Sequence, residues 1–571
     1  MHIGLLLIAC AGLRGDPIET QVDTEDTQDT VTDTDTDTDE PVVDPGMPTF
    51  PDVIDVLHIN ILTGDSQFAG TDSNDLQLCL TATDCFSLDT VDWNDYERGA
   101  MDVNVFEDVD LPRSAVDRVE IRSSSGNDQW RPACIEMSFD GEPMYCKNDF
   151  DQKFGDAGGD ELELWADPLK LHMDCTTCFE QPLSHGPMLG AADSDGARVW
   201  FRTDATRRVQ VRVAETEDGL ATAVPAAYVY PTAADDFTAT VLLDGMGPSA
   251  KRFYDLEVEG VRHGPFPIGT TRTAGTPGDF RFAFGSCSKD AAQPIFASVS
   301  AQDLDLFIFA GDNHYANSDD LASLRQYYRW SLDREFRRDF VGQVPIIATW
   351  DDHDFTGNNT DGSEPGKRTA LRTFNEYWAN PSAGTDSVEG VFFTHAVGDI
   401  EFFVIDDRYW RGFDDTMLGP EQGTWLLDSL KASDATFKFL VSGSQWSIQG
   451  SGDSWAAFPE AQQALMASLV TQRIDGVVFM SGDVHRSEFR LLPGATGGYD
   501  VPELTSSPMA TWNSPCQGES EERECFDSGD FYVVVDVDTT ASNPSFTARI
   551  LDVAGTEKAS WTVSKSELTI P

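Results

Sequence analysis

The order of apolar and polar residues divides most of the chain into three regions of different character. Between about residues 51 and 180, and again between about 184 and 275, short segments alternate apolar and polar residues with a period of two. This period is typical of half-buried β-strands, and turn residues separate the segments. From about 278 to 571, apolar β-rich runs alternate with helical stretches, which indicates an α/β domain.

Individual elements can be placed from the same pattern. In the first region strands are expected at 56–62, 76–80, 102–106, 119–122 and 133–137. The second region holds about seven short strands, compatible with an immunoglobulin- or fibronectin-like sandwich. In the last region strands are expected at 280–284, 306–310 and 476–481, and helices at 323–340, 367–378, 420–432 and 459–472. We therefore expect a multidomain α+β protein, with two β-sandwich domains at 48–180 and 184–275 before an α/β sandwich at 276–571.

The chain is strongly acidic, and the excess charge is not confined to one segment. There are 98 Asp and Glu residues against 39 Lys and Arg, which gives a formal net charge of −59. Residues 11–47 are rich in Asp and Thr and almost free of apolar residues, so we expect a disordered linker there. The rest of the chain is acidic as well. Such a surface disfavours binding to nucleic acid or anionic membranes, and it would repel a phosphate substrate unless bound cations reversed the field locally.

The first ten residues are apolar and end in Leu-Ile-Ala-Cys10, which resembles the lipobox of bacterial lipoproteins. By that resemblance Cys10 would be lipidated, and Ala11 after it points to the outer membrane. No Lys or Arg precedes Cys10, which is unusual for an export signal, and a chance apolar N-terminus is the alternative. We expect an exported protein, either an outer-membrane or cell-surface lipoprotein or otherwise periplasmic or secreted.

The ten cysteines agree with export. Apart from Cys10 and Cys287 they form four local pairs, 79/85, 134/146, 175/178 and 516/525. Even numbers of locally spaced cysteines in an exported chain predict disulfides. The Cys-Thr-Thr-Cys at 175–178 could be half of a zinc site, but no second pair of ligands completes it.

The first β region also resembles a known module. The stretch from Ile61 to Asp75, with Phe106 and Trp130 in later strands, is similar to PLAT domains. That family binds lipid, membrane or protein partners, sometimes with calcium. Asp65, Asp72 and Asp75 could supply calcium oxygens, but a polar turn would also favour Asp at these positions.

Five short segments of the last region place reactive side chains on loops that leave strand ends. They are Gly285-Ser286-Cys287, Gly311-Asp312-Asn313-His314-Tyr315, Trp350-Asp351-Asp352-His353-Asp354, Asp406-Asp407-Arg408 and Gly482-Asp483-Val484-His485. Open sheets bind ligands at the carboxyl ends of their strands. Cys, Asp, Tyr and His offered together are the side chains that a site with more than one metal ion requires. The pattern therefore predicts a metal-dependent phosphoesterase.

These segments resemble, in order, the motifs of calcineurin-like metallophosphoesterases, and in particular the PhoD-type alkaline phosphatases. Gly311-Asp312 and Gly482-Asp483-Val484-His485 match two motifs of the superfamily, and Asp351-Asp352-His353 stands at a third. The features that match the PhoD branch are Cys287 in place of the first motif, Tyr315, the Asn358-Asn359 pair and Arg408. The resemblance covers about residues 184–571, with departures at Asn313-His314 and Thr356-Gly357.

The resemblance implies a metallophosphoesterase sandwich with a bimetallic site. It implies a ferric ion on Cys287, Asp312, Tyr315 and His485, and calcium on Asp312, Asp352 and Asp483. Thiolate and phenolate donors stabilise a trivalent ion, and carboxylate oxygens suit calcium. Asp352 and His353 would be catalytic, with His353 giving a proton to the leaving alkoxide or holding a phosphate oxygen. Arg408 would bind the substrate phosphate.

Structural roles for the same residues are the alternatives. A buried Cys287 could simply be a small apolar residue, and Tyr315 could be a packing residue whose hydroxyl is hydrogen-bonded. Arg408 could pair with Asp351, Asp406 or Asp407 instead of a phosphate. His314 is expected to face solvent.

The expected function is hydrolysis of phosphodiesters, phosphomonoesters or both by a metal-activated hydroxide, in a monomer without a nucleic-acid partner. One alternative is a phospholipase-type diesterase guided by the PLAT-like region, with membrane contact through that region and through lipidated Cys10. Another is a non-catalytic surface protein that binds carbohydrate, lipid or protein. A serine hydrolase is disfavoured because the sequence has no Gly-x-Ser-x-Gly elbow.

Overall fold

The computed structural model describes the chain from residue 44 onward, with gaps. The described residues are 44–46, 50–63, 76–88, 101–123, 132–148, 150, 161–165, 172–173, 182–290, 292–447, 452–518 and 520–571. Residues 1–41 and 42–571 form two separate units, and all described residues belong to the second. The predicted signal at 1–10, the linker at 11–47 apart from residues 44–46, and Asp65, Asp72, Asp75, Cys175 and Cys178 lie outside the described residues.

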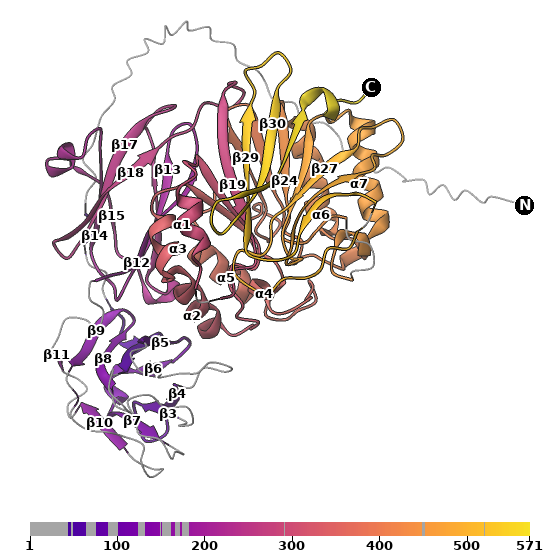
Figure 1. Cartoon of the computed structure of the whole chain (residues 1–571). Coiled ribbons are helices and arrows are strands. Elements are labelled where there is room, and N and C mark those ends of the chain that lie inside the picture. Colours follow the sequence, from indigo (N-terminus) through magenta and orange to yellow (C-terminus); the bar gives the residue numbers. More distant parts are fainter. Residues whose placement is uncertain are drawn as a thin grey trace, which may run out of the picture. The chain divides into compact units, whose positions relative to one another are not determined.

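Two sheets of the first β region enclose an apolar core (Figure 1). Their strand orders are β10-β7-β3-β4 and β11-β9-β8-β2-β5, and β1 pairs with β6. Ile59, Leu78 and Ile121 have no exposed surface in this core. The bounds are β1(Val53–Ile54), β2(Leu57–Thr63), β3(Leu76–Cys79), β4(Cys85–Ser87), β5(Met101–Phe106), β6(Leu111–Pro112), β7(Val119–Ser123), β8(Pro132–Phe139), β9(Glu142–Asn148), β10(Glu161–Trp165) and β11(His172–Met173). The strands expected in this region are present, with ends that differ by one or two residues.

Disulfide bonds also crosslink strands of this region. The predicted disulfide between Cys79 on β3 and Cys85 on β4 is present. Cys134 and Cys146, on β8 and β9, are each disulfide-bonded. These covalent links join neighbouring strands of this small region and restrict its unfolded chain.

The second β region forms a three-stranded sheet, β12-β13-β16, and a four-stranded sheet, β15-β14-β17-β18. Alternate residues of facing strands, among them Val199, Phe201, Val211 and Leu256, meet in one core. The bounds are β12(Leu183–Ala192), β13(Ala197–Thr203), β14(Val209–Ala214), β15(Pro225–Val229), β16(Thr238–Leu243), β17(Lys251–Val258) and β18(Val261–Gly269). Period-two burial on strands of two sheets is the arrangement of a β-sandwich.

Two larger sheets form the C-terminal region. The six-stranded sheet has the order β21-β20-β19-β29-β30-β31, and the seven-stranded sheet has the order β22-β23-β24-β25-β27-β26-β28. The bounds are β19(Asp279–Gly285), β20(Leu306–Ala310), β21(Ile346–Thr349), β22(Phe393–Val397), β23(Ile400–Val404), β24(Phe437–Val441), β25(Val477–Ser481), β26(Ser487–Leu492), β27(Val501–Thr505), β28(Glu522–Phe526), β29(Phe531–Asp538), β30(Ser545–Asp552) and β31(Glu557–Ser564). In the six-stranded sheet β19, β20 and β21 run parallel, and in the seven-stranded sheet β23, β24, β25 and β27 run parallel. Their carboxyl ends therefore lie at one edge of each sheet.

Aromatic residues fill the space between these two sheets. The ring of Phe282 on β19 lies 5.0 Å from the ring of Phe402 on β23 and 5.0 Å from that of Phe439 on β24, edge to face in both pairs. None of the three rings is exposed. Burying a phenylalanine contributes about 1.5–3 kcal/mol, so this layer holds the sheets face to face.

Helices cover the outer faces (Figure 1). α6(Gly419–Ala432) and α7(Pro459–Gln472) bury leucines against the seven-stranded sheet. α1(Ile295–Ser300), α2(Leu321–Leu332), α3(Glu335–Val341), α4(Asp352–Phe355) and α5(Lys367–Tyr377) cover the six-stranded sheet. No helix within the described ranges is long and apolar enough to cross a lipid bilayer.

The single helix expected at 323–340 is wrong, because the structure has two helices there. α2 closes with the Asp333 N–H donating to the carbonyl of Arg329, and Arg334 then takes ψ 128° before α3 begins. An extended residue cannot continue the hydrogen-bond ladder, so the chain turns at this point. The apolar period runs through the turn, which is why the sequence pattern does not show the break.

Candidate metal centre

Strands of both sheets deliver the predicted ligands to one place. Cys287 follows β19, Asp312 and Tyr315 follow β20, and Asp483 and His485 follow β25. Cys287, Asp312, Asp483 and His485 have φ of 61°, 52°, 66° and 54°. Non-glycine residues rarely adopt this left-handed conformation, which costs roughly 1–3 kcal/mol and clusters at functional sites. The strained backbone turns each side chain into the site immediately after its strand ends.

Glycine permits these loops to approach each other. Gly311 has φ +91°, and a Cβ on it would lie 2.7 Å from the Cβ of Asp351. A Cβ on Gly482 would lie 2.6 Å from the carbonyl oxygen of Ala310. Both positions therefore require glycine, one for its conformation and both for space.

The first ligand group contains Cys287, Asp312 and His485, whose ligand atoms all lie within 4.8 Å of one another. The Cys287 Sγ lies 3.4 Å from Asp312 Oδ2. The Tyr315 hydroxyl donates to the same oxygen at 3.0 Å and lies 3.2 Å from the Nε2 of His485. None of the four side chains is more than 7% exposed. The structure thus brings together all four residues expected to bind the ferric ion.

The second group shares Asp312 with the first and adds Asp352 and His353. The Oδ2 of Asp352 accepts the backbone N–H of Asn359 at 2.7 Å, whereas its buried Oδ1 has no hydrogen-bond partner among the described residues. A buried carboxylate oxygen without a donor is costly unless a cation binds it. Asp483 is in neither group, although its backbone oxygen lies 3.6 Å from Cys287 Sγ.

His353 lies at the edge of the second group. Its Nδ1 is 2.5 Å from Asn317 Oδ1, and its Nε2 is 3.9 Å from Asp352 Oδ1. The ring lies against the ring of Tyr315, tilted by 30°, with centroids 4.1 Å apart. The carboxamide oxygen of Asn317 accepts from Nδ1, which leaves Nε2 facing the carboxylates.

Burial dominates the electrostatics of the site. It raises the pKa of the Cys287 thiol and of the Tyr315 hydroxyl well above their ordinary values. The pKa of Asp312 is also raised well above its usual range, first by burial and then by the neighbouring Asp352. Burial lowers the pKa of His485 to about 4. Three acidic groups are thus crowded where their anionic forms are disfavoured, and a multivalent cation is the partner that such a set accommodates.

Arg408 is placed differently from the expectation that it binds substrate. Its Nε donates to Asp351 Oδ1 at 2.6 Å, and its other nitrogens donate to Asp453 at 2.9 and 2.8 Å and to Ser444. Arg408 has no exposed surface. The substrate-binding assignment is therefore corrected in favour of the pairing with Asp351, because a phosphate could reach this guanidinium only by displacing two buried carboxylates.

Sequence reasoning missed the residues that fix the ligand loops. Asp354 accepts from the backbone and side chain of Asn313 and from the backbone of Asp351, and burial raises its pKa to about 7. Ser507 donates to the Cys287 Sγ at 3.1 Å. In the sequence, the departure of Asn313 from the family pattern was the signal that could have pointed to this residue. His314, expected to face solvent, is instead 2% exposed, with its ring against Tyr328.

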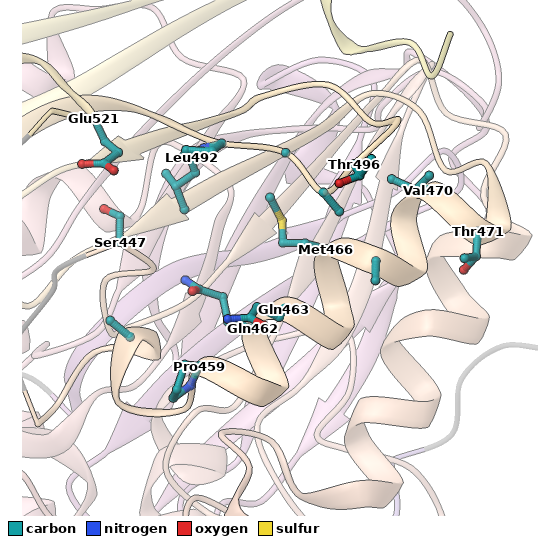
Figure 2. Close-up of a pocket in the computed structure, with 15 residues that line it drawn as sticks. Ser447, Pro459, Gln462, Gln463, Met466, Val470, Thr471, Leu492, Thr496 and Glu521 are labelled. Atoms are coloured by element: carbon teal, nitrogen blue, oxygen red, sulfur yellow. The ribbon is translucent and has the colours of Figure 1, made fainter.

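A pocket of about 910 Å³ lies elsewhere, between α7 and the segment after β26. Figure 2 shows Gln462 and Met466 on the α7 side of this pocket and Leu492 and Thr496 on the other. It contains none of the ligand residues. The catalytic candidates lie in the strand-end loops and not in this pocket.

Two parts of the chain match known family models. Residues 282–523 match the family model "PhoD-like phosphatase", and residues 180–273 match "Domain of unknown function (DUF7800)". Alkaline phosphatase D of Bacillus subtilis (strain 168) is 24% identical over 313 residues, covering 43% of this chain and 52% of the relative. The chain thus spans about half the length of this curated relative.

Solved structures show the same fold. A structure of PhoD has a TM-score of 0.61 at 17% identity and covers 69% of this chain and 93% of its own. Purple acid phosphatase PPD1 from yellow lupin (Lupinus luteus) seeds has a TM-score of 0.52 at 12% identity and covers 90% of each chain. The sheet-rich α+β structure therefore fits a metallophosphoesterase-like fold. The family match over residues 282–523 and these relatives together point to a phosphoric ester hydrolase.

Proposed function

We propose that this protein hydrolyses phosphate esters, diesters or monoesters, at a bimetallic site built on Asp312. The observation that carries the proposal is that Asp312 belongs to both ligand groups, one with Cys287 and His485 and one with Asp352 and His353. A carboxylate shared by two groups is the arrangement that holds two cations close together. The PhoD-like phosphatase match over the same loops supports this reading.

The donor sets differ in a way that fits two different ions. Cys287, Tyr315 and His485 offer sulfur, phenolate and imidazole beside Asp312, and these donors suit ferric iron. Asp352 offers an unpartnered oxygen on the other side of Asp312, and with Asp483 it would supply the oxygens that calcium requires. Bound cations would offset the charge of the phosphate and lower the pKa of an attacking water.

The residues of the chain then orient the ester and move protons. His353 is fixed by Asn317 at Nδ1, so its Nε2 is the atom that can give a proton to the leaving oxygen or hold a phosphate oxygen. Burial lowers the pKa of His353. Hydrogen bonds made by Asn313, Asp354 and Ser507 hold the ligand loops in position. Fixed groups contribute to catalysis because they do not reorganise as charge moves.

The test uses the purified full chain and two chromogenic esters, bis(p-nitrophenyl) phosphate and p-nitrophenyl phosphate, with metal content measured on the same samples. Activity should disappear in Asp312→Asn and after chelation of calcium. It should persist in Asp428→Asn, which changes an exposed carboxylate on α6. A wild-type protein that binds both metals and hydrolyses neither ester would contradict the proposal. Phospholipid vesicles as a third substrate test the phospholipase-type alternative.

We also propose that the protein acts outside the cytoplasm. The disulfides Cys79–Cys85 and Cys516–Cys525 support this, since disulfides persist in oxidising compartments. Anchoring through Cys10 belongs to the same proposal. Labelling cells with a clickable fatty acid should mark the wild-type chain and leave Cys10→Ala unmarked. Equal labelling of both chains, or of neither, would refute the anchor.

A further inference from the structure

Lys289 and Trp512 lie together at the exposed side of the ligand groups. The Nζ of Lys289 is 4.8 Å from the ring centroid of Trp512 and 5.6 Å from that of Tyr315. The Trp512 ring meets the ring of His485 edge to face at 4.5 Å. Both residues therefore contact predicted metal ligands while their own side chains reach solvent.

Backbone hydrogen bonds hold this pair in place. The N–H of Lys289 donates to the carbonyl of Ala510 at 2.9 Å, and the N–H of Ala510 donates to the carbonyl of Cys287 at 3.1 Å. On the other side of Trp512, the N–H of Ser514 donates to the carbonyl of His485 at 2.9 Å. The loop that carries Trp512 is thus tied to the loops of two ligands.

The next residues add a second anchor. Asn513 and Gly529 exchange two hydrogen bonds, at 2.7 and 3.0 Å, and the disulfide Cys516–Cys525 closes the segment between them. Trp512 is nevertheless 55% exposed, the largest value among the large hydrophobic side chains exposed in the described residues after Val224. A tryptophan held rigidly with half its surface in water is typical of a recognition surface.

The positive charge available to a substrate lies on the same side of the site as Trp512. Arg408 is fully buried and engaged by two carboxylates, so it offers nothing to a substrate. Lys289 is exposed, and its charge acts on both His353 and His485 by Coulomb interaction. In a protein with a net charge of −59, a cation at the mouth of the site attracts an anionic ester.

We infer that Lys289 and Trp512 form a subsite for the organic part of the substrate, selecting phosphate esters with a planar ring system. Trp512 stacks on the ring, and Lys289 pairs with an anionic oxygen of the same ester. The reactive phosphate must contact the buried ligands, so its organic group extends outward past these two residues. The inference rests on the proposed hydrolysis at this site and names its substrate class.

The test compares two non-hydrolysable probes, phenylphosphonate and methylphosphonate, as competitive inhibitors of bis(p-nitrophenyl) phosphate hydrolysis by the full chain. The wild type should bind phenylphosphonate about tenfold more tightly than methylphosphonate. Trp512→Ala should remove this preference, and Trp512→Phe should retain most of it. Lys289→Gln should weaken the binding of both probes about fivefold without changing the ratio of their affinities. Lys289→Arg should restore the affinity for both.

Control experiments distinguish failure of the subsite proposal from failure of the proposed hydrolysis. Lys558→Gln removes an exposed charge on β31 and should leave both inhibition constants unchanged. Melting temperatures of the variants establish that they fold, and calorimetric titration with both phosphonates reports binding without turnover. An unchanged phenyl preference in Trp512→Ala would overturn the subsite while hydrolysis stands. Absence of hydrolysis in the wild type would overturn the proposed function instead, and the titration would still decide the subsite.

Discussion

Asn313 donates two hydrogen bonds to one oxygen of Asp354. Its backbone N–H lies 3.1 Å and its side-chain Nδ2 lies 2.5 Å from Asp354 Oδ2. The other oxygen of Asp354 accepts the backbone N–H of Asp351 at 2.7 Å. The two loops that carry Asp312 and Asp352 are therefore joined by a buried carboxylate that is not expected to bind metal. Ligand spacing in this site depends on a contact between residues outside the ligand set.

Replacement of Asn313 by Ala should disturb both loops. The change removes the side-chain donor to the buried Asp354, while the backbone N–H of residue 313 remains. This loss costs about 1–3 kcal/mol, and we expect metal affinity and kcat to fall about tenfold. Metal content, hydrolysis rates and Tm of the purified variant measure these effects. Asn380→Ala is the matched control, because Asn380 exchanges two hydrogen bonds with the backbone of Ala348. If both variants lose stability and both keep full metal content, the positioning role of Asn313 is wrong.

Arg408 should be needed for stability more than for substrate affinity. In Arg408→Ala the buried carboxylates of Asp351 and Asp453 lose the Arg408 guanidinium, although Arg411 still pairs with Asp453, and the expected cost is about 3–5 kcal/mol. Arg408→Lys keeps the charge but loses the planar fork, so a smaller loss is expected. Thermal denaturation and KM are measured together, with the 77% exposed Arg368 replaced by Ala as control. An unchanged Tm with a raised KM would return Arg408 to the substrate-binding role.

Substitution of Cys287 tests whether this residue binds metal or only packs in the core. If its thiolate binds iron, both Cys287→Ser and Cys287→Ala should lose iron, and hydrolysis should fall by about a hundredfold or more. A cysteine that only packs would tolerate Ala, since the side chain is small and has no exposed surface. Elemental analysis of the purified variants, beside their activity, separates the two cases. Full iron content in Cys287→Ala would remove Cys287 from the ligand set.

Glu503 should make stability depend on pH. Burial raises its pKa from 4.5 to about 7, although Trp446, Ser447 and Ser481 donate to its carboxylate. The folded state therefore holds a proton that the unfolded chain has released. Its stabilising contribution is complete below pH 4.5 and is lost as the pH rises to about 7, a change of about 3 kcal/mol.

The variant Glu503→Gln isolates this contribution. Its stability relative to wild type should increase as the pH rises from about 4.5 to about 7, because the variant has no carboxyl group to ionise. Calorimetric Tm values across this range provide the measurement. Glu421→Gln, at an exposed position on α6, is the control. If the stability difference between wild type and Glu503→Gln were the same at all pH values, burial would not raise the pKa of Glu503 as described.

The sequence by itself determined the strands and most helices, and it singled out the candidate ligands that the structure brings together. Period-two alternation and apolar runs depend on local chemistry, so β2, β20 and β25 fall where they were expected. Cys287, Asp312, Tyr315 and His485 could be selected because each directly follows such a run or stands within a few residues of it. The pairs 79/85 and 516/525 followed from short spacing alone.

Only the tertiary structure decided which polar residues serve the site and which serve the fold. Arg408 reaches Asp453 across 45 positions of sequence, and Asn313 reaches Asp354 across 41, so neither partner is visible in a local pattern. Lys289 and Trp512 stand more than 200 residues apart and meet because the loops after β19 and β27 pair through Ser288 and Ala510. Local periodicity sets the elements, but the strand order sets which loop ends share an edge, and hydrogen bonding between those loops assigns each side chain its role.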